Sequence, residues 1–579
     1  MPYLDNLKFN WRINTIFVVM AIFLLAIIYR LIDIQVINSQ KYLALANSQQ
    51  SRKFEIPAKR GEIFLEDNGQ LYPIALNQSL KLLYADPKFI KDPTDVSKKL
   101  SPIIGIDEAK LTEALSNKNS RYVELKQKIS KEDATRINAL KIAGLVLRDK
   151  DYRYYTEGNL YSQVLGYVNN DGIGQYGIEG YLDSELAGTP GLLRAVTDSL
   201  GIPINSQDNT LLEARDGKSY ILTIDRTVQS LADKAIVKAV QNNRAQSGSM
   251  IVMDPKTGEI IAMANYPNFD PNNYFEVKDY TLFKNSTITN LYEPGSGFKI
   301  FTMSAGLDSG KIKPETTYND TGSVTVSGKT INNAENKKYG IQTMTDVIQK
   351  SLNTGAVFIL QALGTDPNKI TLAGKELLYE YIKKFGFGIK SGIEQPGEPD
   401  GFVKAPKTYD IDYANMTFGQ GISITSIQMI IGAAAIANGG KLYQPHLVKK
   451  IVDKDKVAVL NKPKVIRDNV ISPQTAATVA SMMVRVVEHG SGYLTKTKGY
   501  NIAGKTGTAQ VPKANGQGYE EDKNIGSFVG FAPVEDPKFI ILVRVDYPKV
   551  QGFAEKTAVP AFAEVARELL KYYQIPPSN

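Results

Sequence analysis

The chain has 579 residues, of which 43% are hydrophobic and 22% are charged, so it is long enough for two or more folded domains and is not a disordered protein. The formal net charge is +8, but basic and acidic residues are interleaved, which argues against a nucleic-acid-binding patch. The absence of cysteine excludes disulfides and thiol nucleophiles. Because the only histidines are His446 and His489, we expect no metal site, no cofactor and no Ser-His-Asp triad.

The N-terminal region contains one segment that is long and apolar enough to cross a bilayer. Nearly every residue from Ile13 to Tyr29 is apolar, and this character continues to about residue 36. We therefore predict a transmembrane helix over residues 13–36, since about 20 apolar residues span the hydrocarbon core. A cleaved signal peptide is the alternative, but its candidate site, Ala44-Leu45-Ala46, lies too far beyond the apolar run.

The charges beside this helix predict its orientation. Lys8 and Arg12 precede it, which favours a cytoplasmic tail of residues 1–12, although Arg30 and Lys41 on the other side reduce the contrast. No later apolar run reaches spanning length. The rest of the chain is thus expected outside the cytoplasm, attached to the membrane by a single pass.

Two further regions follow the predicted anchor. Residues 37–215 mix short strands with polar helices, and Arg60 to Phe64 leads into the turn signal Asp67-Asn68-Gly69, which predicts a hairpin. From residue 216 the pattern changes to an α+β arrangement. It begins with a strand over 220–224, a helix capped by Asp225 that reaches about Gln241, and strands near 250–253 and 260–263.

A serine and a lysine three residues apart open a predicted helix that runs to Asp308. The segment Tyr292 to Lys299 contains Ser296 and Lys299, and residues three apart share a helix face, so the lysine amine can lie beside the hydroxyl. A serine hydroxyl needs a base, and a lysine made neutral by desolvation can supply one. The helix N-terminus can also stabilise an oxyanion. The alternative is a helix-capping serine followed by a solvated lysine.

Two downstream segments supply candidate partners for Ser296. Ser351-Leu352-Asn353 follows a short helical stretch over 345–350 and can bring a hydroxyl and an amide to the site, or can simply end that helix. Lys505-Thr506-Gly507-Thr508 follows a strand-like run, where glycine permits close backbone approach and an extended substrate can dock along the edge. Similar triplets at Lys256 and at Lys390 occur in a β-turn and a Gly-rich loop, so we interpret them as decoys.

These three motifs together resemble the Ser-x-x-Lys, Ser-x-Asn and Lys-Thr-Gly set of penicillin-binding proteins and serine β-lactamases. The resemblance covers nearly the whole chain and is closest to class B penicillin-binding proteins of the cell-division (FtsI) branch. Further matching segments are Arg60–Ile63, Asp67–Gly69, Gly166–Asn169, Gly174–Gly180, Leu222–Asp225, Asp254–Glu259, Tyr292–Ser296, Phe418–Gly421, Ala503–Gln510 and Phe528–Pro533.

The resemblance implies an α+β fold with a single N-terminal transmembrane helix, an elongated pedestal domain over 37–215 and a transpeptidase domain over 216–579, built on an antiparallel sheet flanked by helices. It implies that Ser296 forms an acyl-enzyme and that Lys299 accepts its proton. By the same resemblance, the remaining site residues relay protons, position the substrate amide, bind the donor carboxylate and form the oxyanion hole: Ser351, Asn353, Lys505, Thr506, Gly507 and Thr508. Gly297 and Leu352 depart from the residues usual in the first two motifs.

The implied activity is a D-Ala-D-Ala transpeptidase that cross-links peptidoglycan stem peptides and is a target of β-lactams. The implied location is the inner membrane, with a polytopic glycosyltransferase and divisome proteins as partners and no nucleic acid. A septal role is favoured, with an elongation role as the alternative. A β-lactamase would need a deacylating base, and a β-lactam sensor usually has more membrane helices; neither feature is found in the sequence.

Overall fold

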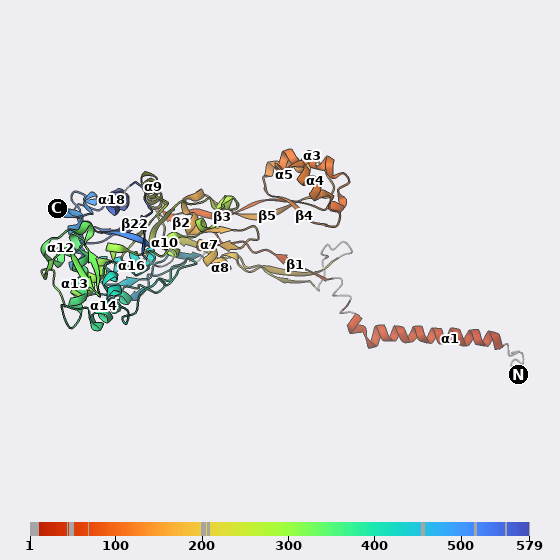
Figure 1. Ribbon diagram of the computed structural model, residues 1–579. Helices are drawn as coiled ribbons and strands as arrows, with labels where there is room; N and C mark the ends of the chain where they lie inside the picture. The colour runs from red at the N-terminus through yellow and green to blue at the C-terminus, as the bar shows by residue number, and fades with distance from the viewer. Residues whose placement is uncertain are drawn as a thin grey trace, which may run out of the picture. The chain divides into compact units, whose positions relative to one another are not determined.

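A computed structural model of the chain describes residues 11–42, 45, 51–67, 69–197, 204, 209–452, 458–513, 518–550 and 553–577 (Figure 1). The chain divides into two compact units. The first comprises Met1–Lys59 and Gly188–Asp216, and the second comprises Arg60–Ala187 and Gly217–Asn579.

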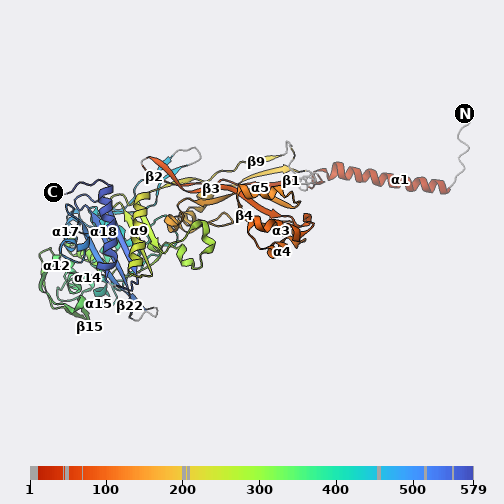
Figure 2. The same cartoon turned by 90° about the horizontal axis from the view of Figure 1, so that it is seen from above.

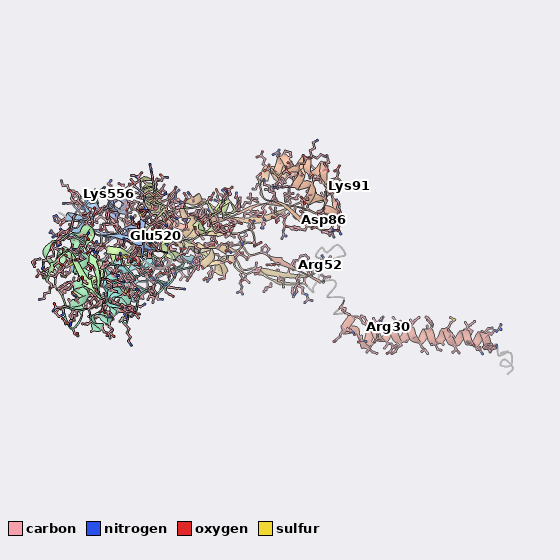
Figure 3. All side chains as sticks on the ribbon, in the orientation of Figure 1. Arg30, Arg52, Asp86, Lys91, Glu520 and Lys556 are labelled. Atoms are coloured by element: carbon pink, nitrogen blue, oxygen red, sulfur yellow. The ribbon has the colours of Figure 1, made fainter. Side chains whose placement is uncertain are left out.

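The first unit contains the apolar helix that the sequence predicts. Helix α1, Trp11–Ile32, continues through a π-helical turn, Asp33–Ile37, and the combined 27 residues are long and apolar enough to cross a membrane. The exposed Arg30 lies near its end (Figure 3) and pairs with Asp33 at 2.8 Å. Lys8, which precedes the helix, and Ala44 and Ala46, in the candidate cleavage site, lie outside the described residues.

A small antiparallel sheet completes the first unit. Its strand order is β1 (Ser51–Ile56), β8 (Gly191–Val196) and β9 (Thr210–Leu212). A bridge between Thr189 and Arg215 lies just beyond the paired strands. The chain thus enters and leaves the second unit through paired segments, because these strands flank residues 60–187 in the sequence.

The second unit begins with a seven-stranded mixed sheet. Its order is β19 (Ala458–Leu460), β18 (Val448–Val452), β10 (Ser219–Leu222), β2 (Ile63–Asp67), β3 (Gln70–Ala85) and β4 (Val123–Ile129), and β5 (Leu145–Tyr155) also pairs with β3. The predicted hairpin is present, since Asp67 pairs with Gln70 across a turn in which Gly69 has φ +77; Asn68 lies outside the described residues. At the other end of β3, buried leucines and isoleucines of β3 and β4 pack against helices α3 (Pro93–Ile104), α4 (Glu108–Ser116) and α5 (Lys131–Ala139).

Strand β10 joins the two predicted domains. It pairs in parallel with β2, from the predicted pedestal, and antiparallel with β18, from the predicted transpeptidase region. One cluster of buried apolar side chains likewise extends from Ile63 to Leu542. The boundary at residues 215/216 therefore stays a prediction, because the hydrogen-bonded sheet continues across it.

A five-stranded antiparallel sheet forms the centre of the predicted transpeptidase region. Its order is β12 (Ile260–Tyr266), β11 (Ser247–Met253), β23 (Phe539–Asp546), β22 (Tyr519–Ala532) and β21 (Ala503–Pro512). Successive strand residues face opposite sides, and here both sides are apolar: Met250 and Val252 join one buried cluster, whereas Ile251 and Met253 join another. Both faces are therefore covered, and the sheet is buried.

Helices cover the two faces of this sheet. One face packs against α9 (Arg226–Asn242) and α18 (Ala554–Tyr572), which lie side by side (Figure 2), and Asp225 caps α9 as predicted by accepting from the Val228 amide at 2.9 Å. The other face packs against α16 (Ser426–Ala437). Helix α17 (Pro473–His489) packs against α16. The other helices on this side pack against α17 or against one another: α11 (Lys299–Asp308), α12 (Met344–Gln349), α13 (Asn353–Leu363), α14 (Leu372–Lys384) and α15 (Asp410–Met416).

Short elements connect these layers. They are β6 (Tyr167–Val168), β7 (Gly174–Gln175), β13 (Thr317–Asp320), β14 (Ser323–Val326), β15 (Lys329–Asn332), β16 (Gly340–Thr343), β17 (Leu442–Tyr443), β20 (Val465–Arg467), α6 (Ser162–Leu165), α7 (Gly177–Tyr181), α8 (Asp183–Ala187) and α10 (Ser286–Thr289).

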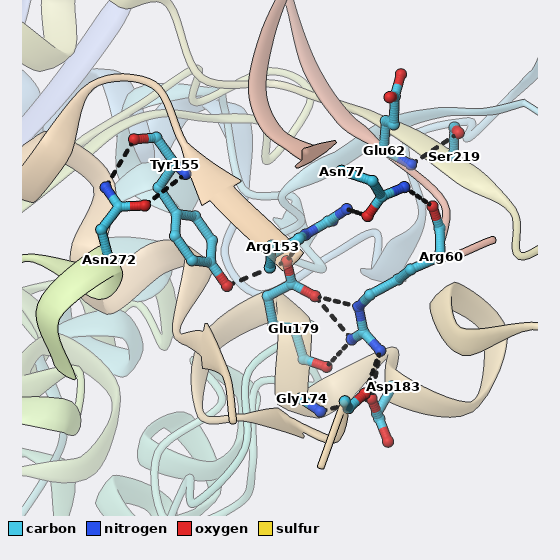
Figure 4. Close-up of polar contacts among 11 residues, drawn as sticks. Arg60, Glu62, Asn77, Arg153, Tyr155, Gly174, Glu179, Asp183, Ser219 and Asn272 are labelled. Carbon is cyan, nitrogen blue, oxygen red and sulfur yellow. Dashed lines mark hydrogen bonds and ion pairs between the residues drawn. The ribbon is translucent and has the colours of Figure 1, made fainter. Parts of the chain in front are cut away.

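A buried ion network explains two of the sequence segments singled out above (Figure 4). The fully buried carboxylate of Glu179, on α7, pairs with Arg60 at 2.7 Å and with Arg153, on β5, at 2.6 Å. Arg60 also pairs with Asp183 at 2.7 Å, and its main-chain carbonyl accepts a 2.6 Å hydrogen bond from Asn77. The segments around Arg60 and around Glu179 are thus joined by this buried ion-pair network.

Removing Glu179 should strongly destabilise the fold, because two arginines would be left buried with fewer partners. We expect Glu179→Ala to cost about 3–5 kcal/mol and to lower the melting temperature by several degrees. Glu564→Ala is the matched control: its ion pair with Lys238 is exposed, so its loss should cost less than about 1 kcal/mol. Equal melting temperatures for the two variants would contradict the stabilising role of the network.

Candidate active site

Ser296 lies in a tight turn that leads directly into α11. The turn, Gly295–Phe298, is a 3₁₀ helix. The α-helix begins at Lys299, whereas the sequence predicted that it begins at Ser296. Gly295 has φ +55, and a Cβ there would lie 2.5 Å from the carbonyl oxygen of Thr508. Glycine therefore allows the serine turn to approach the backbone of strand β21.

Lys299 contacts the Ser296 hydroxyl, with Nζ 3.1 Å from Oγ. The same amine donates to the carbonyl oxygen of Ser351 at 2.6 Å and to Oδ1 of Asn353 at 2.7 Å, and it lies 3.2 Å from the Ser351 hydroxyl. A neutral lysine amine has two N–H groups and one lone pair. Since the two carbonyl-type oxygens can only accept, they occupy both N–H groups, and the lone pair is left for a hydroxyl.

The electrostatic surroundings favour this neutral form. Lys299 is 1% exposed, and its burial, together with the positive charge of Lys505, holds the pKa of its ammonium well below the ordinary value. Lys505 is also fully buried, and burial lowers its pKa to about 7, partly opposed by the charge of Glu555. Within the described part of the chain, neither lysine forms an ion pair with a carboxylate.

Ser351 lies between the two lysines. Its Oγ is 3.2 Å from Nζ of Lys299 and 3.0 Å from Nζ of Lys505. Its backbone has φ +58, a conformation that costs energy for a residue with a Cβ. This conformation separates α12 from α13, so Asn353 is the first residue of a new helix and not the end of the preceding one.

The third motif lies on edge strand β21, beside the serine turn. A Cβ on Gly507 would lie 2.6 Å from the carbonyl oxygen of Pro294, so only glycine permits this approach. Nζ of Lys505 donates to the Thr506 carbonyl at 3.0 Å, and the Thr508 hydroxyl accepts from the Ala554 amide at 3.4 Å. The outer edge of β21 has no strand partner among the described residues, which leaves it open to an extended peptide.

The two similar triplets lie elsewhere and have other contacts. Lys256 is in the turn between β11 and β12, where its side chain pairs with Asp536. Ser391 and Gly392 donate their amides to the buried Glu398. Neither triplet has a hydrogen bond to Ser296, Lys299 or Ser351 within the described residues, whereas the triplet at Lys505 does.

Two residues near this site were not singled out from the sequence for a role. Ser491 shares a 2.7 Å hydrogen bond with the Thr506 hydroxyl. Glu293 accepts from the Gly421 amide at 2.9 Å and from the Tyr519 hydroxyl at 3.1 Å, and burial raises its pKa. The position of Glu293 near Ser296 was a usable signal, but the Gly-Ser-Gly context of Ser491 indicates only a turn.

Family models match most of the chain. Residues 248–571 match the penicillin binding protein transpeptidase domain, and residues 55–222 match the penicillin-binding protein dimerisation domain. The chain belongs to the class B penicillin-binding proteins. It therefore has a transpeptidase domain and a pedestal of the dimerisation type, as the sequence resemblance implies.

Related penicillin-binding proteins align over almost the full chain. Stage V sporulation protein D of Bacillus subtilis is 32% identical over 99% of this chain and 87% of its own length. Peptidoglycan D,D-transpeptidase FtsI of Buchnera aphidicola is 32% identical over 98% of this chain and 96% of its own. The crystal structure of penicillin binding protein 3 from Mycobacterium tuberculosis, complexed with aztreonam, has a TM-score of 0.69 at 27% identity and covers 91% of this chain and 98% of that one.

One departure from the usual penicillin-binding protein motif has a visible packing environment. Gly297 stands where the first motif more often has threonine, and a Cβ there would lie 3.1 Å from the methyl group of Met429. That methyl group is the flexible end of a side chain. The space that a side chain at position 297 would occupy is thus partly filled by Met429.

Substitutions of Lys505 and of Lys256 should affect penicillin labelling of this penicillin-binding protein to different extents. Lys256→Ala removes an exposed ion pair and should leave labelling by a fluorescent penicillin within about twofold of wild type. Lys505→Ala removes a buried, hydrogen-bonded amine next to Ser351 and should lower the labelling rate at least about tenfold. Melting curves would show whether each variant is folded, and equal losses of labelling would contradict the positional argument.

Proposed function

We propose that this protein is a serine D,D-transpeptidase that cross-links peptidoglycan stem peptides through an acyl-enzyme on Ser296. The observation that carries the proposal is the 3.1 Å contact between Ser296 Oγ and an amine whose two N–H groups are occupied by Ser351 and Asn353. Such an amine can accept the serine proton. The family and the relatives named for peptidoglycan D,D-transpeptidase activity support the substrate class.

In the acylation step, Ser296 Oγ attacks the carbonyl carbon of the penultimate D-alanine and its proton moves to Lys299. The main-chain N–H groups of Ser296 and Thr508 stabilise the oxyanion. The bond to the terminal D-alanine then breaks, and Ser351, placed between the two lysines, passes a proton to the departing amine. Lys505, Thr506 and Thr508, with Gly507 allowing close approach, bind the terminal carboxylate, and Asn353 positions the peptide amide.

The second step transfers the acyl group. The amine of a second stem peptide attacks the ester carbonyl, loses a proton to the Lys299 and Ser351 pair, and forms a new amide bond while Ser296 recovers its proton. A β-lactam acylates the same serine but leaves no separate amine fragment, so the ester persists. No metal or cofactor takes part in this scheme.

We further infer that α1 anchors the protein in the inner membrane, with its N-terminus cytoplasmic and the remainder periplasmic. The apolar 27-residue helix, with Arg12 in its first turn, supports this orientation. Septal synthesis, in contact with a polytopic glycosyltransferase and divisome proteins, is the favoured role, and elongation is the alternative. A fluorescent fusion located at midcell or along the sidewall would distinguish them.

The nucleophile can be tested by covalent labelling. Ser296→Ala in the detergent-solubilised protein should abolish labelling by a fluorescent penicillin while the melting curve stays close to that of wild type. Mass spectrometry of the labelled wild type should place the adduct on the peptide that contains Ser296. An adduct on Ser351 would refute the assignment.

The base can be tested with a lysine-to-arginine change. Lys299→Arg keeps a cation but supplies a guanidinium that does not lose its proton in a protein, so the second-order acylation rate should fall by about 10²–10⁴. In wild type, the rate should persist at neutral pH and decline at acidic pH, because the pKa of Lys299 is lowered and protonation removes the lone pair. An arginine variant that acylates within a few-fold of wild type would exclude Lys299 as the proton acceptor.

A further inference from the structure

A buried polar cluster lies at the start of α13, directly behind Asn353. Its members are Asp320, Asn333 and Thr354, which are 2%, 4% and 6% exposed. The Asn333 amide group donates to both carboxylate oxygens of Asp320, at 2.9 and 3.1 Å. Asp320 also accepts from the Thr354 hydroxyl at 2.8 Å and from the amides of Gly322 and Tyr339. Every oxygen of this carboxylate is therefore occupied.

Asn333 caps α13 from outside the helix. The residue in the N-cap position, Leu352, has no side-chain acceptor, and the first N–H groups of a helix need one. Oδ1 of Asn333 accepts from the amides of Asn353 and Thr354 at 2.9 and 3.2 Å. The backbone position of Asn353 thus depends on a side chain 20 residues earlier in the chain.

The side chain of Asn353 is held by Asn332, the last residue of β15. Its Nδ2 donates to the carbonyl oxygen of Asn332 at 2.8 Å, and this contact fixes which end of the amide faces Lys299. The other end, Oδ1, accepts from Nζ of Lys299 at 2.7 Å. A chain of hydrogen bonds therefore leads from the buried carboxylate of Asp320, through Asn333 and Asn353, to the amine beside Ser296.

We propose that Asn333, oriented by Asp320, is a positioning residue for acylation: it sets the place of Asn353 and thereby directs the lone pair of Lys299 toward Ser296. The proposal rests on the proposed function of Ser296 and Lys299. Its physical basis is that an acceptor on one N–H group of the amine fixes where the remaining lone pair points. A displacement of about 1 Å in such an arrangement can lower a rate about 10²-fold.

Asn333→Ala removes both the helix cap and the donor to Asp320. In the full-length protein, with a fluorescent penicillin over a range of concentrations, the limiting first-order acylation rate should fall about 10–100-fold. The dissociation constant of the complex before acylation should rise by a smaller factor than the rate falls, because Lys505 and the threonines of β21 are untouched and only the contact of Asn353 with the substrate amide is affected. The matched control is Asn319→Ala: Asn319 precedes Asp320 in β13 and is exposed, so it should behave as wild type.

Exchanging the carboxylate and the amide between positions 320 and 333 distinguishes an effect on the position of Asn353 from a general loss of stability. Asn333→Asp keeps an acceptor for the two amides but places two carboxylates side by side, and Asp320→Asn alone places two amide donors together. Combining both changes restores one donor facing one acceptor between the two side chains, but it also replaces an acceptor of the Gly322 or Tyr339 amide by a donor, so the recovery is partial. The double variant should therefore acylate about tenfold faster than Asn333→Asp alone, since contacting residues couple. If Asn333→Ala fails to fold, this comparison of acylation rates still tests the positioning role of Asn333.

The outcomes are distinguishable. A limiting rate for Asn333→Ala within twofold of wild type, or a double variant no faster than Asn333→Asp, would overturn the positioning role while Ser296 labelling of wild type still supports the transpeptidase. A fall in the rate that the melting curve fully accounts for, without rescue by the exchange, would also overturn it. If wild type itself were not labelled at Ser296, the proposed function would fail first.

Discussion

Two lysines are buried on either side of the Ser351 hydroxyl, and neither forms an ion pair with a carboxylate of the described residues; the chemistry of the site depends on this constraint. Burying a charge without a counterion is so unfavourable that the group gives up its proton instead. Lys299 is 1% exposed and Lys505 is fully buried; burial lowers the pKa of both, and the charge of Lys505 lowers the pKa of Lys299 further. The protein thus obtains a base at neutral pH from a side chain that is ordinarily cationic, which compensates for the near absence of histidine.

Holding the lysines together requires three chain segments to meet at backbone contact distance. Glycines at 295 and 507 make this possible, because any side chain at either position would collide with a carbonyl oxygen of the facing segment. A third segment, around Ser351, adopts a left-handed backbone conformation to place its hydroxyl between the amines. The site is therefore assembled by backbone geometry, and the buried sheet and helices around it prevent these strained segments from relaxing.

Much of the fold and the composition of the site follow from local patterns. The apolar N-terminal helix, the Asp225-capped helix and the hairpin at Asp67 each depend on residues close in sequence, and each is present. The choice among the three Lys-[Ser/Thr]-Gly segments also followed from local context, because a turn between strands and an edge strand have different patterns. The parallel pairing of β10 with β2 could not be predicted, since nothing local reports a partner more than a hundred residues away. The same holds for Asn333, whose cap serves a helix that begins beyond β16 and α12, and for Ser491.

The continuous sheet through β2, β10 and β18 bears on how the chain acquires its structure. Strand β2 ends at Asp67, its neighbour β10 begins at Ser219, and β18 begins at Val448. Such distant pairings form slowly, because a long loop must close before the contact stabilises it. A growing chain that emerges N-terminus first therefore exposes the edge of β2 until β10 has been delivered, and then exposes the edge of β10 until β18 has been delivered. For this interval the nascent protein presents an unpaired strand edge, which is the kind of surface on which chaperones act and from which aggregation begins.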